Sequence, residues 1–230
     1  MKSVVIALSI AASVALAVPA QAAPPPGTEK AKLTGKKGPS LFRPGFQLAE
    51  YDGNATVKSS KSSVTGVFQG DKAALEMTVN GPSLGPVEVT CGGGQSRLGL
   101  GWITFDRDKL QFFCTITGPG AGTDATFALA QSRGAGLLKA IQQPQRAAEL
   151  RFGGLSLRAR TEQVGGMPIG GGQVLGYVFS RDGVDVGAVD LIGGMGQPAA
   201  YLPPKGAKDR DAVAVMSLIL IFFKDPGRQK

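Results

Sequence analysis

Three arginines lie close enough in the sequence to form one anion-binding cluster. Arg158 and Arg160 are two residues apart in LSLRART, so in a β-strand their side chains share one face. Arg151 belongs to the preceding segment, AAELRFGG, and a hairpin would place it across from them. Guanidinium groups bind phosphate or carboxylate through paired hydrogen bonds. The alternative is a solvated outer face on which Glu149 or Glu162 pairs with these arginines.

A second concentration of positive charge lies nearer the N-terminus. Residues 23–44 are rich in Pro, Gly and Lys and contain one acid, Glu29, against five basic residues: Lys30, Lys32, Lys36, Lys37 and Arg43. This composition predicts a flexible basic arm, or equally a plain linker, outside the folded core. Near an anionic lipid surface such an arm gains up to about 1 kcal/mol per basic residue.

The sequence contains no histidine. Ser-His-Asp and Cys-His catalysis and the H-E-x-x-H zinc site are therefore excluded, because each needs an imidazole. Paired carboxylates, a lysine or a tyrosine remain as possible catalytic groups. The glycine triplets at 92–94 and 170–172 fit neither the P-loop spacing nor the dinucleotide-binding loop. We expect a non-enzymatic protein with no catalytic residues and no cofactor.

Two cysteines, Cys91 and Cys114, are present. In an exported chain, two thiols in strand-like segments predict a disulfide, and the loop closed would stabilise the fold by roughly 3 to 4 kcal/mol. A redox or metal role is the alternative, but the spacing is not C-x-x-C. Asp182, Asp185 and Asp190 lack the spacing of a calcium loop, and Asp182 fits a turn. We expect structural roles for these aspartates and no metal site.

The first residues predict export. Lys2 precedes an apolar stretch at 4–18 and an A-x-A site at 20–22, which is typical of a secretory signal peptide over residues 1–22, cleaved after Ala22. A transmembrane anchor is the alternative, but the apolar stretch is short. We expect a periplasmic or secreted protein that is not integral to a membrane. Its net charge of +8 favours anionic lipids or envelope polymers, and nucleic acid is not expected.

Beyond Pro44 the chain consists of short apolar or alternating segments separated by Gly, Asn and Asp, which is typical of antiparallel strands. About twelve strands are predicted, including segments at 64–70 and 96–105. Turns are expected at 52–53, 106–109 and 182–183, and a short helical turn at 137–142. The 34 glycines suit the turns and bends of a strongly curved sheet. Residues 45–225 are predicted to form a single domain.

The C-terminal segment has the strong helical pattern. DAVAVMSLILIFFKDPG is apolar throughout residues 212–223 except at Ser217, and Asp209 or Asp211 lies where a helix favours an acid. We predict a helix over about 209–224, with a buried strand as the alternative. A helix that is apolar on every face must be surrounded, and twelve residues rise only about 18 Å. A closed or nearly closed barrel of about twelve antiparallel strands would enclose it.

The late hairpin GYVFSRDGVDVGAVDL and the terminal DRDAVAVMSLILIFF, together with the strand count, resemble the tubby-like C-terminal fold. This fold is shared by tubby, the phospholipid scramblases and the LURP-one-related proteins. The resemblance covers residues 46–223 as a pattern, without a diagnostic short motif. It implies a barrel threaded by an apolar helix and, as in tubby, binding of anionic phospholipid headgroups. The basic residues that hold the phosphoinositide in tubby match no positions here, and the eukaryotic relatives work in the cytosol.

Three classes of function follow from these observations. The first is an exported β-barrel module that binds an anionic lipid or envelope component through a basic surface. The second is a structural or accessory envelope protein that acts by contact with another protein. The third is an enzyme that uses carboxylates or lysine. Because no catalytic pattern is present, the first is the prediction.

Overall fold

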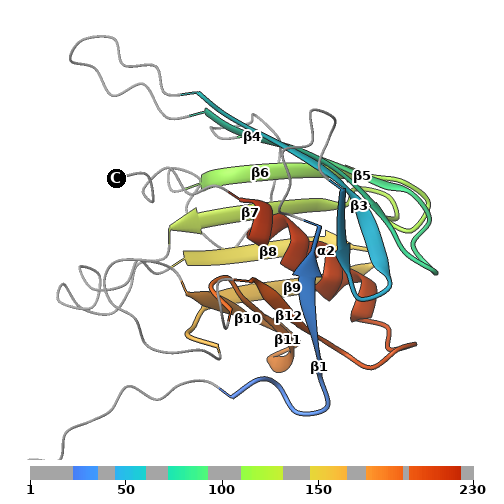
Figure 1. Ribbon diagram of the computed structural model, residues 1–230, viewed down its shortest axis with the longest axis vertical. Coiled ribbons are helices and arrows are strands. Elements are labelled where there is room, and N and C mark those ends of the chain that lie inside the picture. Colours follow the sequence, from blue (N-terminus) through green and yellow to red (C-terminus); the bar gives the residue numbers. More distant parts are fainter. Residues whose placement is uncertain are drawn as a thin grey trace, which may run out of the picture.

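The protein is a barrel of strands that follow one another along the chain. The computed structural model describes residues 23–35, 45–60, 72–92, 110–131, 146–164, 175–193 and 197–223. These contain β1 (Glu29–Thr34), β2 (Gly45–Leu48), β3 (Tyr51–Ser60), β4 (Lys72–Asn80), β5 (Val87–Gly92), β6 (Leu110–Thr117), β7 (Thr126–Gln131), β8 (Arg146–Phe152), β9 (Leu155–Thr161), β10 (Gly176–Arg181), β11 (Val184–Asp190), β12 (Ala199–Leu202) and α2 (Arg210–Phe222). Each strand pairs antiparallel with its neighbours in sequence, and β1 pairs with β12, so the sheet closes (Figure 1). Closure leaves no unpaired edge.

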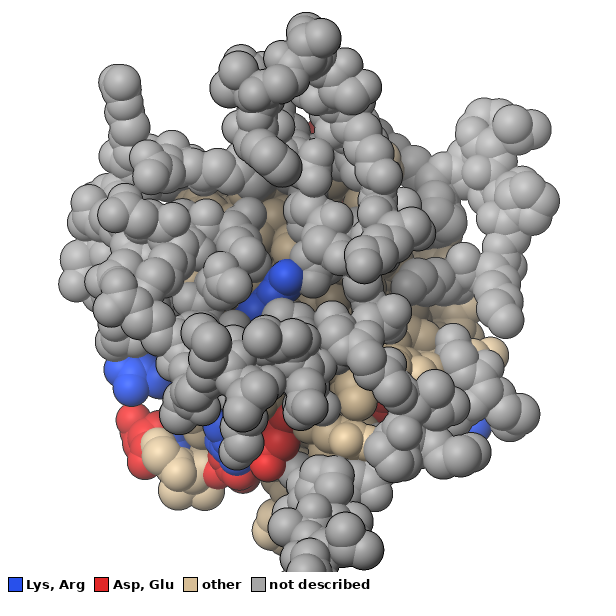
Figure 2. Space-filling view, turned by 90° about the vertical axis from the view of Figure 1, so that its left-hand side faces the viewer, with Lys and Arg blue, Asp and Glu red and all other residues tan. Residues whose placement is uncertain are grey.

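The alternating strand directions give the barrel two different ends. The connections β2–β3, β4–β5, β6–β7, β8–β9 and β10–β11 lie at one end, where α2 also begins after β12; we call this the turn end. The strands β1, β3, β5, β7 and β9 finish at the opposite end, which we call the far end. The segments 36–44, 61–71, 93–109, 132–145 and 165–174 fall outside the described residues. Viewed from the far end, acidic and basic side chains lie intermixed at the lower left, and basic side chains also show near the centre and at the lower right (Figure 2).

Helix α2 runs through the inside of the barrel (Figure 1), and its residues 212–222 are all buried. Two aromatic pairs connect its last turn to the wall. Phe46 of β2 packs against Phe222 with ring centroids 5.2 Å apart, and Phe112 of β6 packs against Phe223 at 4.7 Å. Because α2 is apolar on every side, it packs against the apolar inner face of the sheet, and protein fills the lumen.

Two details let the helix fit this lumen. Ser217, the polar residue within the apolar run, donates its hydroxyl to the carbonyl of Val213 at 2.7 Å, so its burial leaves no unpaired donor. Gly187 of β11 faces the helix, and a Cβ at that position would lie 2.5 Å from Cγ1 of Val213. The strand and the helix therefore approach each other as closely as only glycine allows.

The predicted fold class is confirmed. The protein is mainly β, with twelve antiparallel strands in a closed barrel around a buried C-terminal helix. The helix predicted over about 209–224 is observed at Arg210–Phe222, so the alternative of a buried strand is wrong. The turn predicted at 182–183 is also confirmed, with positive φ values of 52° and 82° that suit a tight hairpin.

The prediction that residues 23–44 form a flexible arm is wrong for Glu29–Thr34, which form β1 and close the barrel against β12 and β2. Ala31 and Leu33 face the core, whereas Lys30 and Lys32 are exposed. This alternation is the signal of a half-buried strand. Only two apolar residues carry it, so the basic composition concealed it.

The turn predicted at 52–53 is also wrong, because Leu48 pairs with Tyr51 and the chain turns at Ala49 and Glu50. Tyr51 is the first residue of β3, and its side chain faces the core with 1% of its surface exposed. Ala49 takes the left-handed conformation, with φ 53°, without being a glycine. Sequence signals based on Gly and Asp therefore pointed three residues too far along the chain.

Several predictions lie outside the described residues. They are the signal peptide at 1–22, the strands at 64–70 and 96–105, the turn at 106–109 and the helical turn at 137–142. In the part of the chain that the structure describes, no helix has the length and apolarity to cross a membrane.

Candidate functional site

A pocket of about 420 Å³ opens at the turn end, beside the start of α2. Its walls come from the β2–β3 turn, the β4–β5 connection, the loop after β12 and the first turn of α2. These segments contribute Glu50 and Tyr51, Pro82 and Ser83, residues 205–208, and Arg210 and Asp211. The volume lies within the range of small-molecule sites in proteins.

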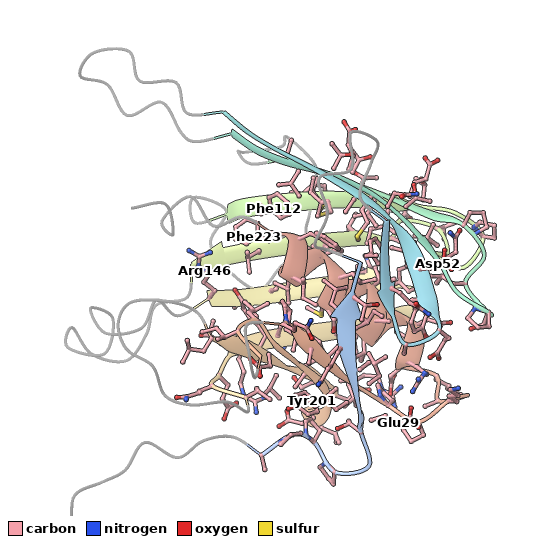
Figure 3. The ribbon with its side chains drawn as sticks, viewed as in Figure 1. Glu29, Asp52, Phe112, Arg146, Tyr201 and Phe223 are labelled. Carbon is pink, nitrogen blue, oxygen red and sulfur yellow. A yellow bond between two sulfur atoms is a disulfide. The ribbon has the colours of Figure 1, made fainter. Side chains whose placement is uncertain are left out.

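Arg210 attaches the start of α2 to the barrel wall. Its Nε and Nη2 donate to the two carboxylate oxygens of Glu50, at 2.5 and 2.9 Å. Its Nη1 donates to Glu29 of β1 at 3.1 Å and to the carbonyl of Pro203. Glu29 lies at the side of the barrel away from Arg146 and Phe223 (Figure 3). Since Arg210 is 4% exposed, its charge depends on these partners.

The ion pair between Arg210 and Glu50 is stable to changes of pH near neutrality. The hydrogen bond from Arg210 lowers the pKa of Glu50, although burial of the carboxyl opposes it. The same bond raises the pKa of Arg210. Both side chains therefore keep their charges at physiological pH, and each neutralises the other.

Asp211 receives two hydroxyl donors. Oη of Tyr51 donates to Oδ1 at 2.6 Å, and Oγ of Ser83 donates to Oδ2 at 2.7 Å. Burial, together with the bond to Asp211, raises the pKa of Tyr51, so this phenol is a neutral donor. Within the described residues no cation forms an ion pair with Asp211. Its carboxylate lies in the first turn of α2, where the helix dipole favours a negative charge.

Two lysines complete the charged lining of the pocket. Lys205 and Lys208 belong to the loop after β12, and both are exposed. In the part of the chain that is described, neither forms an ion pair with a carboxylate, although Lys205 is near enough to act electrostatically on Glu50. The pocket therefore combines a carboxylate held by hydroxyls with two available ammonium groups.

The arginines predicted as anion contacts lie on the outer face, but their charges are largely matched. Arg160 donates from Nη1 and Nη2 to Asp185 at 2.7 and 2.8 Å, and from Nε to Glu162 at 3.0 Å. The hydrogen bonds between Arg160 and Asp185 raise the pKa of Arg160 and lower that of Asp185. Nε of Arg158 lies 3.7 Å from Glu149. The alternative of a solvated face with paired acids therefore describes these two residues.

Arg151 takes the predicted place on the neighbouring strand. It is exposed on β8 and pairs in register with Ser156, two residues before Arg158 on β9. The sequence thus gives the shared face correctly. It could not show that Asp185, on β11, reaches the same row of side chains, because that contact depends on the order of the strands.

Lys30 and Lys32 provide an unmatched basic surface on β1. Nζ of Lys30 lies 5.5 Å from the ring centroid of Tyr201 on β12, the position labelled in Figure 3. Among the residues described, neither lysine forms an ion pair. We refer to the two β1 lysines and the two after β12 as the lysine surface: Lys30, Lys32, Lys205 and Lys208. The other basic residues predicted for the arm, Lys36, Lys37 and Arg43, lie outside the described residues.

The predicted disulfide is confirmed. Cys91 of β5 and Cys114 of β6 face each other in register, with their sulfurs 2.10 Å apart. Such a bond is typical of an oxidising, exported compartment.

The aspartates near the late hairpin serve structure. Asp182 occupies the β10–β11 turn, and Asp190 accepts hydrogen bonds from the backbone N–H groups of Ile192 and Gly193.

Comparison of the chain with known protein families, with curated proteins and with solved structures finds no match.

Proposed function

We propose that the protein is an exported, non-enzymatic binding module, periplasmic or secreted, that attaches to an anionic lipid or envelope polymer through the lysine surface. One observation carries the proposal. The four lysines are exposed and, within the described residues, form no ion pairs, whereas Arg158 and Arg160 have carboxylate partners.

Unmatched ammonium groups are the part of a basic protein that an anionic surface attracts. Each lysine near such a surface contributes about 1 kcal/mol, so four give roughly 4 kcal/mol before any contact of the surrounding chain. Lys36, Lys37 and Arg43 follow β1 in the sequence without an intervening acid and add to the same attraction. The predicted signal peptide and the resemblance to tubby-like proteins support an envelope lipid as the ligand.

Vesicle co-sedimentation tests the proposal. We expect the mature chain to bind vesicles of phosphatidylglycerol and phosphatidylcholine, but not phosphatidylcholine alone, at about 50 mM NaCl and to be released at about 500 mM. The double variant Lys30→Gln/Lys32→Gln is expected to bind several-fold more weakly. Arg158→Gln/Arg160→Gln removes the same formal charge from paired residues and serves as the matched control.

The outcomes separate the competing functions. Absence of binding at both salt concentrations overturns the proposal. An equal loss in the two double variants would show that net charge alone, and not the lysine surface, determines binding. Recovery of one protein in stoichiometric amount without lipid, in a pull-down from the envelope, would instead support an accessory protein.

A further inference from the structure

The pocket at the turn end retains charges of both signs after its internal contacts are counted. Glu50 is neutralised by Arg210 through two hydrogen bonds. Asp211 is bonded by the hydroxyls of Tyr51 and Ser83, which carry no charge, so its negative charge persists. Lys205 and Lys208, in contrast, bring two positive charges to the same lining.

We propose that this pocket binds a small aminoalkyl phosphate, a molecule with a primary ammonium group at one end and a phosphate at the other. The ammonium donates to Asp211, and the phosphate lies against Lys205 and Lys208. A phosphate carries a charge of about −1.5 to −2 as a monoester at pH 7. Together with one ammonium it balances one carboxylate and two lysines almost completely. This ligand is additional to the anionic surface of the proposed function.

A primary ammonium fits the carboxylate because it supplies donors where acceptors remain. Each oxygen of Asp211 has accepted one hydroxyl and keeps further acceptor capacity, and Oγ of Ser83 can also accept. Tyr51 is 1% exposed and fixes the carboxylate before any ligand arrives, which reduces the ordering cost of binding. A quaternary ammonium has no N–H group and cannot use these acceptors.

The phosphate end is matched by flexible cations. Lys205 and Lys208 are three residues apart in an exposed loop, and their ammonium groups can close on one phosphate from two sides. Glu50 is already paired with Arg210, so Asp211 is the remaining carboxylate of the described lining and can balance only one of the two lysine charges. Binding should therefore need both ends of the ligand together.

Isothermal titration of the mature chain with four probes tests this arrangement. O-phosphoethanolamine carries both groups, ethanolamine only the ammonium, inorganic phosphate only the anion, and phosphocholine a quaternary nitrogen. We expect O-phosphoethanolamine to bind at least tenfold more tightly than each of the other three. Equal affinity for inorganic phosphate, or no measurable binding of O-phosphoethanolamine, overturns the proposal.

Substitutions at the two ends locate the site. Asp211→Asn should remove the preference over inorganic phosphate, and Lys205→Gln/Lys208→Gln should remove the preference over ethanolamine. Arg158→Gln/Arg160→Gln removes the same formal charge from residues that do not line the pocket, so it is the matched control and should leave the affinity unchanged. If Asp211→Asn does not fold, Lys205→Gln/Lys208→Gln still tests the proposal, because both lysines are exposed. Unchanged affinity in the lysine variant would place binding elsewhere and overturn the proposal.

Vesicles distinguish a lipid headgroup from a free metabolite. Retention on phosphatidylethanolamine vesicles that free O-phosphoethanolamine reverses supports the lipid source, and binding of the free compound alone supports the soluble source. Both outcomes support the pocket. The proposed function is tested separately, because binding to phosphatidylglycerol vesicles can fail or persist while the response to O-phosphoethanolamine does the reverse.

Discussion

At the start of α2, three charged residues, Asp209 to Asp211, precede a run of buried apolar residues, and the two regions contact the barrel in different ways. We call these three residues the charged turn. The apolar run at 212–222 meets side chains from around the wall, including Phe46 and the face of β11 opened by Gly187. In the charged turn, each residue has specific partners: Asp209 accepts from Arg181, Arg210 donates to Glu29 and Glu50, and Asp211 accepts from Tyr51 and Ser83.

This difference separates stability from position. Apolar contact is non-directional and proportional to the area removed from water, so the apolar run supplies most of the driving force for enclosing the helix. Hydrogen-bonded charges are directional and costly to bury without their partners. The charged turn therefore fixes how far α2 enters the barrel and how it is rotated. It also forms the pocket, since the same contacts gather the walls.

The largest expected effect is a charge within the apolar run. Leu218 is fully buried in the middle of α2, so Leu218→Asp would place a carboxylate among apolar groups without a partner. We expect no folded protein, measured as loss of soluble yield and of near-ultraviolet circular dichroism. Val184 is 66% exposed, and Val184→Asp should stay folded as the control. A soluble, folded Leu218→Asp variant would show that the helix can leave the lumen.

The next effect in size concerns the charged turn. Arg210→Met leaves Glu50 and Glu29 without their guanidinium, and we expect the free energy of unfolding in urea to fall by about 3 kcal/mol. In Arg210→Met/Glu50→Gln the stranded charge is removed, so part of that loss should return. Arg158→Met, at an exposed arginine, should change the value by less than about 0.5 kcal/mol. Equal losses of unfolding free energy at Arg210 and Arg158 would contradict the distinction between the buried ion pair of Arg210 with Glu50, which we call the clamp, and a surface charge.

The apolar run could be predicted from the sequence, whereas the charged turn could not. Twelve positions with one polar residue require enclosure whatever the partner, and the strand-like segments supply a wall of suitable size. Partners of the charged turn are distant in sequence: Tyr51 and Glu50 lie 160 residues from their partners on α2, and Ser83 lies 128 residues away. No local pattern specifies such pairs. The acids on either side of Arg210 mark a helix start equally well when they are solvated.

The same limit explains the errors on the exterior. The predicted strand face of Arg158 and Arg160 is correct because alternation is a local property. The neutralisation of Arg160 by Asp185 depends on the bulged pairing of β10 with β11, which alternation does not encode. The strand β1 was missed because its inward side offers only Ala31 and Leu33.

A smaller effect is expected from titration of Glu50. The hydrogen bond from Arg210 lowers the pKa of Glu50 below its ordinary value near 4.5, so its stabilising contribution is present above that pH and is lost as the pH falls through the folded value. Glu50→Gln should reduce the free energy of unfolding by about 2 kcal/mol at pH 7. The difference between the two proteins should shrink toward zero in acid, because a protonated Glu50 resembles glutamine.

Urea unfolding at a series of pH values measures this convergence. Glu88→Gln, at an exposed position on the outer face of β5, provides the control and should differ little from the parent protein throughout. A difference for Glu50→Gln that stays constant down to strongly acidic pH would mean that the side chain contributes by packing rather than by its charge.

The smallest effect is expected for the bidentate pair on the outer face, which joins one guanidinium to one carboxylate by two hydrogen bonds, as Arg210 and Glu50 are joined. Asp185 and Arg160 form two hydrogen bonds of 2.7 and 2.8 Å, but their side chains are 38% and 52% exposed. Water already solvates both charges, so Asp185→Asn should lower the free energy of unfolding by only about 0.5 kcal/mol, and less at high salt. A loss close to that of Arg210→Met would mean that bidentate geometry, rather than burial, gives the clamp its strength. The pocket would then owe its preformed shape to the hydrogen bonds alone.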